Sequence, residues 1–210
     1  MKQKIASAAA AAAITAGAAG AATLAPNNTP AEAQPAELTA VLRDPSGVKV
    51  GVVEFRPRRT GVEVRATLRP NPYVAANAFH GFHVHANNDP GNGTGCVADP
   101  MQASSTWFAS ADGHLTEPGQ THGHHNGDMP SPLVEADGTA RLRFTTHAVD
   151  LADLAGRAVV LHGNADNFGN VPTGTAGTEY TPNGPAATDL TQRTGNAGAR
   201  AACGLIQSRD

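Results

Sequence analysis

Apolar and polar residues alternate one by one in 62–69 and again in 139–145 of the chain. The apolar positions are Val62, Val64, Ala66, Leu68, Ala140, Leu142 and Phe144. Successive side chains of a β-strand point to opposite faces, so this period of two predicts strands with one buried and one solvated face. Half-buried strands of this kind are typical of antiparallel sheets.

Other local signals agree with a β protein. In 48–55 the apolar parity changes between Val52 and Val53, beside Gly51, which predicts a β-bulge. The segment 44–47 (Asp-Pro-Ser-Gly) and the pair 137–138 (Asp-Gly) predict turns. Beyond the N-terminal segment, only 149–155 suggests a short turn of helix, and no other stretch has a helical period.

The strand and turn pattern predicts an all-β fold, either a β-sandwich or a β-barrel. The sequence holds 23 Gly and 15 Pro, which is typical of short strands joined by many loops. The longest loops are expected over 86–110 and 164–198. Loops of that length carry either function or disorder.

The N-terminus has the composition of a secretory signal peptide. Lys2 and Lys4 precede the segment 5–24, which is almost entirely Ala, Gly, Ile and Thr, and 31–33 (Ala-Glu-Ala) fits a cleavage site. We therefore expect 1–33 to be removed and 34–210 to form one domain. A retained membrane anchor is the weaker alternative, because Ala and Gly have marginal transfer energies. The expected location is exported: periplasmic, cell-envelope or extracellular.

Charge and cysteine content narrow the functional class. The formal net charge is -3, and removal of 1–33 leaves 13 basic and 17 acidic side chains, a charge of -4. This acidic balance argues against nucleic acid as a partner. Cys96 and Cys203 are expected to pair in an oxidising compartment, closing a loop worth about 4 to 5 kcal/mol in the entropic model. Two free thiols or an intermolecular bridge are the alternatives.

Candidate metal chemistry begins with Gly81-Phe82-His83-Val84-His85. A strand carrying His at alternate positions points both imidazoles to one face, which forms half of a metal site. Phe82 and Val84 have the opposite parity and are expected to pack into a core beneath the rings.

Further histidines are available to complete the site. His114 follows the turn signal Asp112-Gly113, and His162 ends the apolar run 158–161. One Gly-containing loop carries His122, His124, His125 and Asp128. Imidazoles suit copper and zinc, and a carboxylate among them favours zinc, so there are enough ligands for two metals. His80 and His147 are expected to be structural, since buried histidines are usually hydrogen-bonded.

Several spaced motifs occur together in the order seen in copper-zinc superoxide dismutases, and the chain resembles the exported bacterial branch of that family. The resemblance covers about 38–207. The motifs are His83-Val84-His85, Cys96, His114, the loop from His122 to Asp128, Leu161-His162, Gly195-Asn196-Ala197-Gly198-Ala199-Arg200 and Ala202-Cys203-Gly204.

The resemblance implies an eight-stranded Greek-key β-barrel that dismutates superoxide to oxygen and hydrogen peroxide. The implied copper ligands are His83, His85, His114 and His162. The implied zinc ligands are His114, His122, His125 and Asp128, with His124 as a competitor of His125. Asp166 matches an aspartate that links copper and zinc ligands through their outer nitrogens. His114 matches the imidazole that bridges the metals and acts as general acid, and Arg200 matches the arginine above copper.

Departures from the family pattern bear on zinc and on partners. Only two residues separate His122 from His125, so the zinc loop is compressed, and some exported bacterial members with shortened loops hold copper without zinc. Copper is therefore the expected cofactor, and zinc occupancy stays open. The enlarged 96–114 and 164–198 segments can form the rim of a channel or the surface of a homodimer. The expected partner is superoxide, with no stable membrane anchor.

Two other functions fit a barrel of this kind. A binding module would store or deliver copper or zinc without catalysis, and an interaction domain would keep the barrel and lose its metals. The presence of all four copper ligands and of Arg200 favours the enzyme. Because superoxide is an anion and the protein is net negative, attraction must be local, and Arg200 is the permanent cation placed to supply it.

Overall fold

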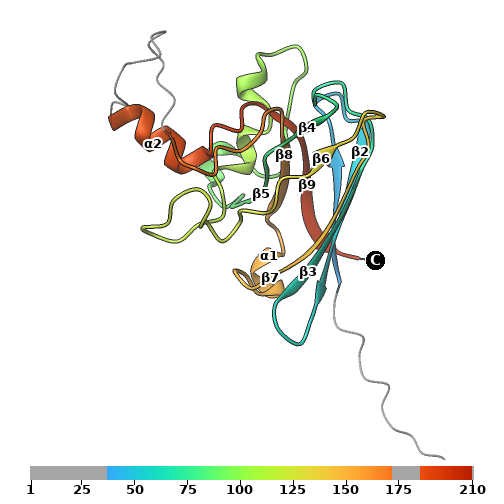
Figure 1. The fold of residues 1–210 in the computed structure, drawn as a ribbon, viewed down its shortest axis with the longest axis vertical. Helices are drawn as coiled ribbons and strands as arrows, with labels where there is room; N and C mark the ends of the chain where they lie inside the picture. Colours follow the sequence, from blue (N-terminus) through green and yellow to red (C-terminus); the bar gives the residue numbers. More distant parts are fainter. Residues whose placement is uncertain (1–36, 172–184, 210) are drawn as a thin grey trace, which may run out of the picture. The chain divides into compact units, whose positions relative to one another are not determined.

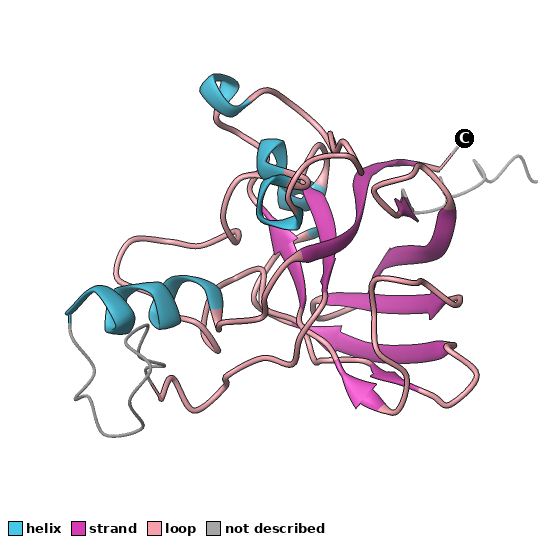
Figure 2. Ribbon diagram, turned by 90° about the horizontal axis from the view of Figure 1, so that it is seen from above, coloured by secondary structure: helices cyan, strands magenta, loops and turns pink. Residues whose placement is uncertain are grey.

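The computed structural model describes residues 37–171 and 185–209. The described part is built mainly of antiparallel strands with a few short helices (Figures 1 and 2). The strands are β1 Leu38–Arg43, β2 Lys49–Pro57, β3 Val62–Leu68, β4 Ala78–Phe79, β5 Phe82–His85, β6 Leu133–Val134, β7 Ala140–Thr146, β8 Ala158–His162 and β9 Arg200–Ser208. The helices are α1 Leu151–Leu154 and α2 Pro185–Thr194, with 3-10 turns at Pro90–Asn92, Ser104–Thr106 and Ala109–Ala111.

One curled sheet dominates the fold. Its strand order is β5-β8-β9-β1-β2-β3-β7, and every neighbouring pair is antiparallel. The pairings of β3 with β7, β5 with β8, and β9 with β1 join strands that are distant in sequence, as a Greek key requires. The predicted all-β, barrel-like fold is confirmed. In place of eight equivalent strands, seven form this sheet and the short β4 and β6 pair separately.

The two alternating segments of the sequence form the strands that the pattern predicts. They are β3 and β7, whose register places Val64 opposite Phe144 and Ala66 opposite Leu142. Val64 and Ala66 are buried in the main hydrophobic core, against which Leu142 and Phe144 also pack. The charged residues between them consequently lie on the outer face of the sheet.

The predicted bulge in β2 exists, but it lies slightly earlier than expected. Leu42 of β1 pairs with Gly51, whereas the next residue, Arg43, pairs with Lys49, so Val50 is the extra residue. A Cβ atom at Gly51 would lie 2.8 Å from the side chain of Leu68. Glycine at this position therefore lets β2 approach its neighbour closely beside the bulge.

The helix predicted within 149–155 is confirmed as α1, which starts at the Asp150 capping box. The prediction that 164–198 is a loop throughout was wrong, because Pro185–Thr194 forms α2. Proline at the start and glycine after the end suit a helix, and Gly195 has φ +58°. The helix has few apolar residues and a polar composition, so its sequence has no clear helical period.

The predicted disulfide is confirmed. Cys96 and Cys203 are bonded, with their Cα atoms 5.5 Å apart and 107 positions apart in sequence. Cys203 lies in β9 and belongs to a second hydrophobic cluster with Trp107 and Phe108. The bond thus fastens the long segment before His114 to β9, an inner strand of the sheet.

The predicted signal peptide, 1–33, lies outside the described residues, and so does its cleavage site. Among the residues that the structure does describe, none of the helices has the length and apolar character needed to cross a membrane.

Candidate metal centre

Strand β5 carries His83 and His85 into the interior. Both side chains are buried, and the alternating Phe82 and Val84 belong to the main hydrophobic core, as their parity predicts. β5 pairs with β8, and His83 lies opposite Val160 in that pairing. The backbone hydrogen bonds to β8 and the packing of Phe82 and Val84 in the core fix where the two imidazoles can lie.

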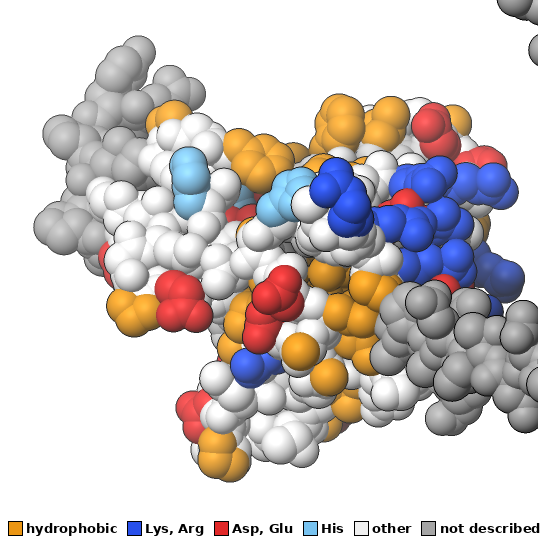
Figure 3. Space-filling model, turned by 90° about the horizontal axis from the view of Figure 1, so that it is seen from below, with side chains coloured by type: hydrophobic (Ala, Val, Ile, Leu, Met, Phe, Trp, Pro, Cys, Tyr) orange, Lys and Arg blue, Asp and Glu red, His pale blue; other side chains and the backbone are white. Residues whose placement is uncertain are grey.

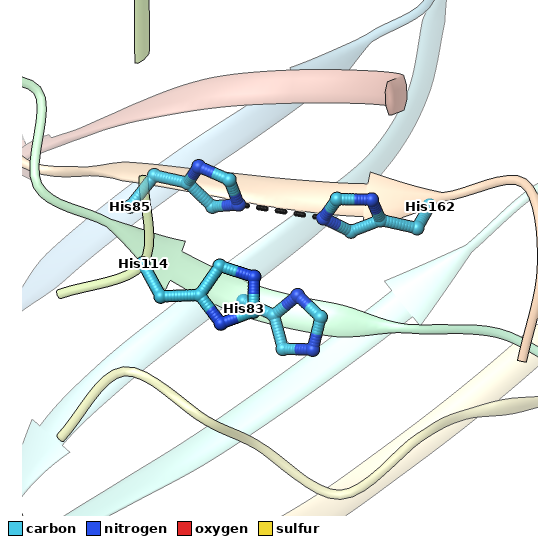
Figure 4. Close-up of side chains that lie close together, drawn as sticks. All are labelled: His83, His85, His114 and His162. Atoms are coloured by element: carbon cyan, nitrogen blue, oxygen red, sulfur yellow. Dashed lines mark hydrogen bonds between the residues drawn. The ribbon is translucent and has the colours of Figure 1, made fainter. Parts of the chain in front are cut away.

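Two further imidazoles complete a four-histidine group. His162 ends β8, and His114 forms an isolated bridge with His85 (Figure 4). One ring nitrogen from each of His83, His85, His114 and His162 lies within 4.8 Å of the others. The structure therefore brings together the four residues that the sequence singles out for copper.

The hydrogen bonds of His85 and His162 leave two lone pairs facing each other. His85 donates from Nδ1 to the carbonyl oxygen of Asp112 at 2.8 Å, and His162 donates from Nδ1 to that of Gly198 at 3.2 Å. A carbonyl oxygen can only accept, so in both neutral rings Nε2 carries a lone pair. These two Nε2 atoms are 3.3 Å apart. Two acceptors that close together repel each other unless a cation, a proton or a metal ion, binds both.

Burial keeps three of these imidazoles neutral, those of His85, His114 and His162. It lowers the pKa of His85 and of His162 well below the usual range for histidine, because the imidazolium form loses its hydration. Burial likewise lowers the pKa of His114 to about 4. At neutral pH these rings therefore present lone pairs, which is the form in which imidazole binds a metal.

A second group adjoins the first through His114. Its Nδ1 is 2.9 Å from Oδ1 of Asp128 and 3.2 Å from Nδ1 of His125. One donor atom from each of these three residues lies within 4.8 Å of the others. His114 consequently belongs to both groups, with Nδ1 in the second group and Nε2 left for the first.

His122 lies beside the second group. Its ring centre is 5.8 Å from that of His114 and 6.2 Å from that of His125. Nδ1 of His122 is buried and has no hydrogen-bond partner among the described residues. A buried nitrogen without a hydrogen-bond partner costs free energy, and binding a metal ion would offset that cost. Three imidazoles and the carboxylate of Asp128 are the kind of donor set that zinc prefers.

Asp166 connects the two groups. Its Oδ1 is 2.9 Å from Nε2 of His83 and 3.2 Å from Nε2 of His122, although only the first pair is aligned as a hydrogen bond. Its Oδ2 accepts from the hydroxyl of Ser131 at 2.9 Å. With Nε2 held by Asp166, His83 is left with Nδ1, which is buried without a partner among the described residues. The carboxylate thus sets the free nitrogen of His83.

The remaining histidines differ in burial and in their distance from the two groups. His125 is buried, whereas His124 is exposed and outside both groups, so the geometry favours His125. His80 is buried, with Nδ1 3.1 Å from the carbonyl oxygen of His162 and Nε2 2.8 Å from that of Ala75, as expected of a structural residue. His147 is exposed, away from both groups.

A cleft of about 1000 Å³ opens onto the four-histidine group. His85, His114 and His162 line it together with Arg200 and with residues of α2, among them Arg193. Arg200 donates from its two terminal nitrogens to the carbonyl oxygens of Phe108 and Asp112. A guanidinium has five N–H donors, so Arg200 keeps donors for an anion in the cleft.

Sequence reasoning missed the two residues that hold Arg200 in place. Phe108 and Asp112 both have positive φ, 55° and 63°, which is unusual for residues other than glycine. Asp112 has ψ -157°, in a region that almost only glycine occupies. Their backbone carbonyl oxygens accept the hydrogen bonds of Arg200. A backbone conformation leaves no direct signal in the sequence. Only the Asp-Gly turn signal at 112–113 marked the place.

The compressed loop around His122 is supported by α2. The backbone N–H of His122 donates to the carbonyl oxygen of Gln192 at 2.7 Å, and the side chain of Asn170 donates to the His122 carbonyl oxygen at 2.7 Å. Gly195 follows α2 directly over the His122 ring, where a Cβ atom would overlap the imidazole. The enlarged segment before Arg200 therefore takes over part of the positioning of this loop.

Comparison with known proteins agrees with this geometry. The family model described as "Copper/zinc superoxide dismutase (SODC)" matches residues 49–206. A superoxide dismutase [Cu-Zn] of Mycolicibacterium paratuberculosis is 34% identical, over 84% of this chain and 78% of the relative. One of Mycobacterium tuberculosis is 36% identical, over 81% of this chain and 70% of the relative.

Solved structures show the same fold. A double mutant of a SOD-like protein from Bacillus subtilis has a TM-score of 0.59, at 24% identity, over 80% of this chain and 96% of that chain. The clock protein EA4 has a TM-score of 0.58, also at 24% identity, over 83% of this chain and 96% of that chain. The family model and the curated relatives cover most of the sequence, including both histidine groups. The chain belongs to the copper/zinc superoxide dismutase family.

Proposed function

We propose that this superoxide dismutase works at the four-histidine group and protects an exported compartment. Membership of the family makes the chain a superoxide dismutase with copper and zinc as cofactors. The assignment of individual residues and the compartment are our proposals. The observation that carries the site is the pair of Nε2 lone pairs of His85 and His162, 3.3 Å apart at the base of the cleft.

His83, His85, His114 and His162 would hold copper through Nδ1 of His83 and Nε2 of the other three. Each of these rings has its second nitrogen engaged on an outer partner, which supports this choice of atoms. Copper supplies the one-electron oxidation and reduction that dismutation requires. Four imidazoles without a carboxylate suit a metal that must change oxidation state.

His114, His122, His125 and Asp128 would hold zinc. The buried, unpartnered Nδ1 of His122 supports a metal there despite the compressed loop. Burial alone would raise the pKa of Asp128, but hydrogen bonds from His114 and His125 bring it below the usual range, so the carboxylate stays ionised. We therefore favour zinc binding over the copper-only alternative.

Arg200 and His114 would act on the substrate itself. Arg200 is held by two carbonyl groups beside the cleft, where it can bind and orient the superoxide anion. With Nδ1 of His114 facing Asp128, its Nε2 faces the four-histidine group, where it would hold copper in one state and, when free of copper, carry the proton delivered to the substrate. Asp166 would hold His83 and His122 in their orientations.

The expected export rests on residues 1–33, and the disulfide between Cys96 and Cys203 is consistent with it. Mass spectrometry of the protein recovered outside the cytoplasm should find an N-terminus near Gln34. Recovery only of the full-length chain inside the cell would contradict export. A homodimer is also proposed, and its test is the molar mass in solution.

The site is tested by titrating metal-depleted protein with copper and zinc while measuring superoxide dismutation. We expect activity to rise with copper and to reach a limit at one copper and one zinc per chain. His162→Ala should remove copper-dependent activity. His125→Ala should lose zinc, whereas the neighbouring His124→Ala, which changes an exposed residue, should bind both metals. Full activity in copper-loaded His162→Ala would refute the assignment, and tight metal binding without activity would favour a storage module.

A further inference from the structure

The outer face of β2, β3 and β7 carries a group of arginines far from the cleft. We call it the cationic face and define it as Arg56, Arg58, Arg65, Arg141 and Arg143. Lys and Arg side chains gather on one side of the surface in Figure 3. Alternation along the strands places four of these side chains outward, since their neighbours Phe55, Val64 and Phe144 face or pack against the core. Arg58 directly follows β2 and pairs with Glu63 of β3.

The cationic face has more positive charge than its own fold requires. The acids that pair with these arginines are Glu37, Glu54 and Glu63. Arg209 also pairs with Glu37 and Glu54, so six arginines against three acids leave three uncompensated charges. The protein as a whole has a net charge of -3. A local excess of this size on an acidic protein needs its own explanation.

The arrangement within the face costs stability. Arg65 and Arg143 lie directly opposite each other on β3 and β7, and like charges in that position repel. Glu63 offsets part of this, because its carboxylate pairs with both of them and with Arg58. The side chain of Glu63 is only 6% exposed, while that of Arg143 is 65% exposed. The guanidinium groups therefore cover the carboxylate and face solvent.

Protection of a sheet edge explains only part of the pattern. β7 is an edge strand, and charged residues such as Arg141 and Arg143 discourage edge-to-edge aggregation. Arg65 and Arg56, however, lie on β3 and β2, inside the sheet, where no edge needs protection. The charge continues across three strands.

We propose that the cationic face binds a linear phosphate polymer. Arginine forks match phosphate oxygens in geometry and keep their charge at any physiological pH. In the described part of the chain, none of the exposed large hydrophobic side chains lies among the outward positions of β2, β3 or β7. A bilayer surface would favour apolar anchors among the charges, and single-stranded nucleic acid would favour aromatic platforms. A phosphate chain needs charge alone.

Binding at this face leaves catalysis accessible. β7, β3 and β2 lie at one end of the sheet order and the histidine-bearing β5 and β8 at the other. None of the residues that line the cleft comes from β2, β3 or β7. A protein held on a polyanion through the cationic face would thus keep its cleft open, and its dismutation rate should be the same in the bound state.

The test is fluorescence anisotropy of labelled long-chain inorganic polyphosphate with the metal-loaded protein over a range of salt. We expect salt-dependent binding that Arg141→Gln/Arg143→Gln weakens about tenfold or more, with the salt slope reduced by roughly 0.7 for each lost phosphate contact. Superoxide dismutation should stay at the wild-type rate, which also shows that the variant folds. Glu54→Gln, which removes an acid from the face, should tighten binding.

A matched control removes the same charge elsewhere. Arg43→Gln/Arg193→Gln changes two exposed arginines outside the cationic face and should bind polyphosphate nearly as the wild type does. Equal weakening by the control would mean that binding is diffuse and would overturn the proposal. Absence of binding at low salt would overturn it as well. Tighter binding to phosphatidylglycerol vesicles than to polyphosphate would replace the polymer by a membrane surface.

Discussion

The backbone carbonyl oxygen of Asp112 accepts a hydrogen bond from Arg200, and the same oxygen accepts another from Nδ1 of His85 at 2.8 Å. One atom therefore fixes both the arginine beside the cleft and the free nitrogen of a proposed copper ligand. Asp112 does this from a strained conformation, with φ 63° and ψ -157°. Its carboxylate is held by the backbone N–H groups of Asn88 and Asp89 at 2.6 and 2.8 Å.

We expect Asp112→Ala to lower activity and stability together. Alanine loses the hydrogen bonds that hold the strained backbone, whose cost is about 1–3 kcal/mol. The carbonyl oxygen should then turn away from Arg200 and His85. Superoxide dismutation per bound copper should fall about tenfold, because a small misplacement of a positioning group is costly. The copper electron paramagnetic resonance spectrum should change with it.

Two further variants distinguish the hydrogen bonds of the Asp112 carboxylate from the backbone strain at Asp112. Asp112→Asn keeps an oxygen for the two backbone N–H groups and should restore most of the activity. Asp112→Gly adopts the conformation without strain but has no anchor, so it should fold stably and remain slow. An unaltered copper spectrum and rate in Asp112→Ala would show that this carbonyl does not position the site.

Arg200→Gln should slow dismutation and weaken its dependence on salt. The variant removes a permanent cation from the cleft, and electrostatic steering commonly accounts for about tenfold or more in rate. The comparison variant is Arg193→Gln, which also lines the cleft but forms an ion pair with Asp189 at 2.9 Å. Its effect should be smaller, because its charge is already offset. Pulse radiolysis at several ionic strengths measures both, and equal effects would contradict a special role for Arg200.

Gly195→Ala should lose zinc while keeping copper. Gly195 has φ +58°, and a Cβ atom there would overlap the His122 ring. Gly47→Ala is the matched control, since Gly47 has φ +81° but open space around it. Both substitutions carry backbone strain of about 1 kcal/mol, and only the first displaces a proposed zinc ligand. Metal analysis after dialysis distinguishes them, and full zinc content in Gly195→Ala would contradict the ligand role of His122.

The metal-free protein should lose stability as the pH falls from about 6.5 to 4. Burial lowers the pKa of His85, His114 and His162, that of His114 to about 4, whereas unfolded histidine titrates near 6.5. The unfolded chain then binds more protons in this window, so the free energy of unfolding falls by up to about 1.4 kcal/mol per pH unit for each group. Urea unfolding at pH 7 and pH 5 measures it.

One histidine shifts in the opposite direction. Burial would lower the pKa of His122, but Asp166 and Asp128 raise it overall, so its own contribution favours folding at low pH. The three histidines with a lowered pKa outweigh the contribution of His122 to the pH dependence of stability. A metal-free protein that is equally stable or more stable at pH 5 would contradict the neutral, buried state of His85, His114 and His162.

The sequence predicted those features that depend on side-chain type and strand period. His83 and His85 follow from alternation on β5, and the pairing of Cys96 with Cys203 follows from the oxidising compartment. Arg200 was found through the family motif around it. Helix α2 was missed because its polar sequence has no helical period, and its position depends on contacts with the His122 loop.

The hydrogen bonds that orient the site were harder to predict. The carbonyl groups of Phe108 and Asp112 act through the backbone, and their positive φ values are imposed by tertiary contacts. The choice of His125 over His124 also depended on burial, which two adjacent histidines in a loop do not reveal. Residue type identified the ligands, and only the folded backbone shows which nitrogen of each ring is free.

The central claim is that four imidazoles, from His83, His85, His114 and His162, hold the catalytic copper. X-ray absorption at the copper edge, on protein loaded with one equivalent each of copper and zinc, tests it most directly. The account predicts that oxidised copper has four imidazole nitrogen ligands at about 2.0 Å, the usual length of a bond from imidazole to such a metal. A sulfur ligand, or three or fewer imidazoles at oxidised copper, would contradict it.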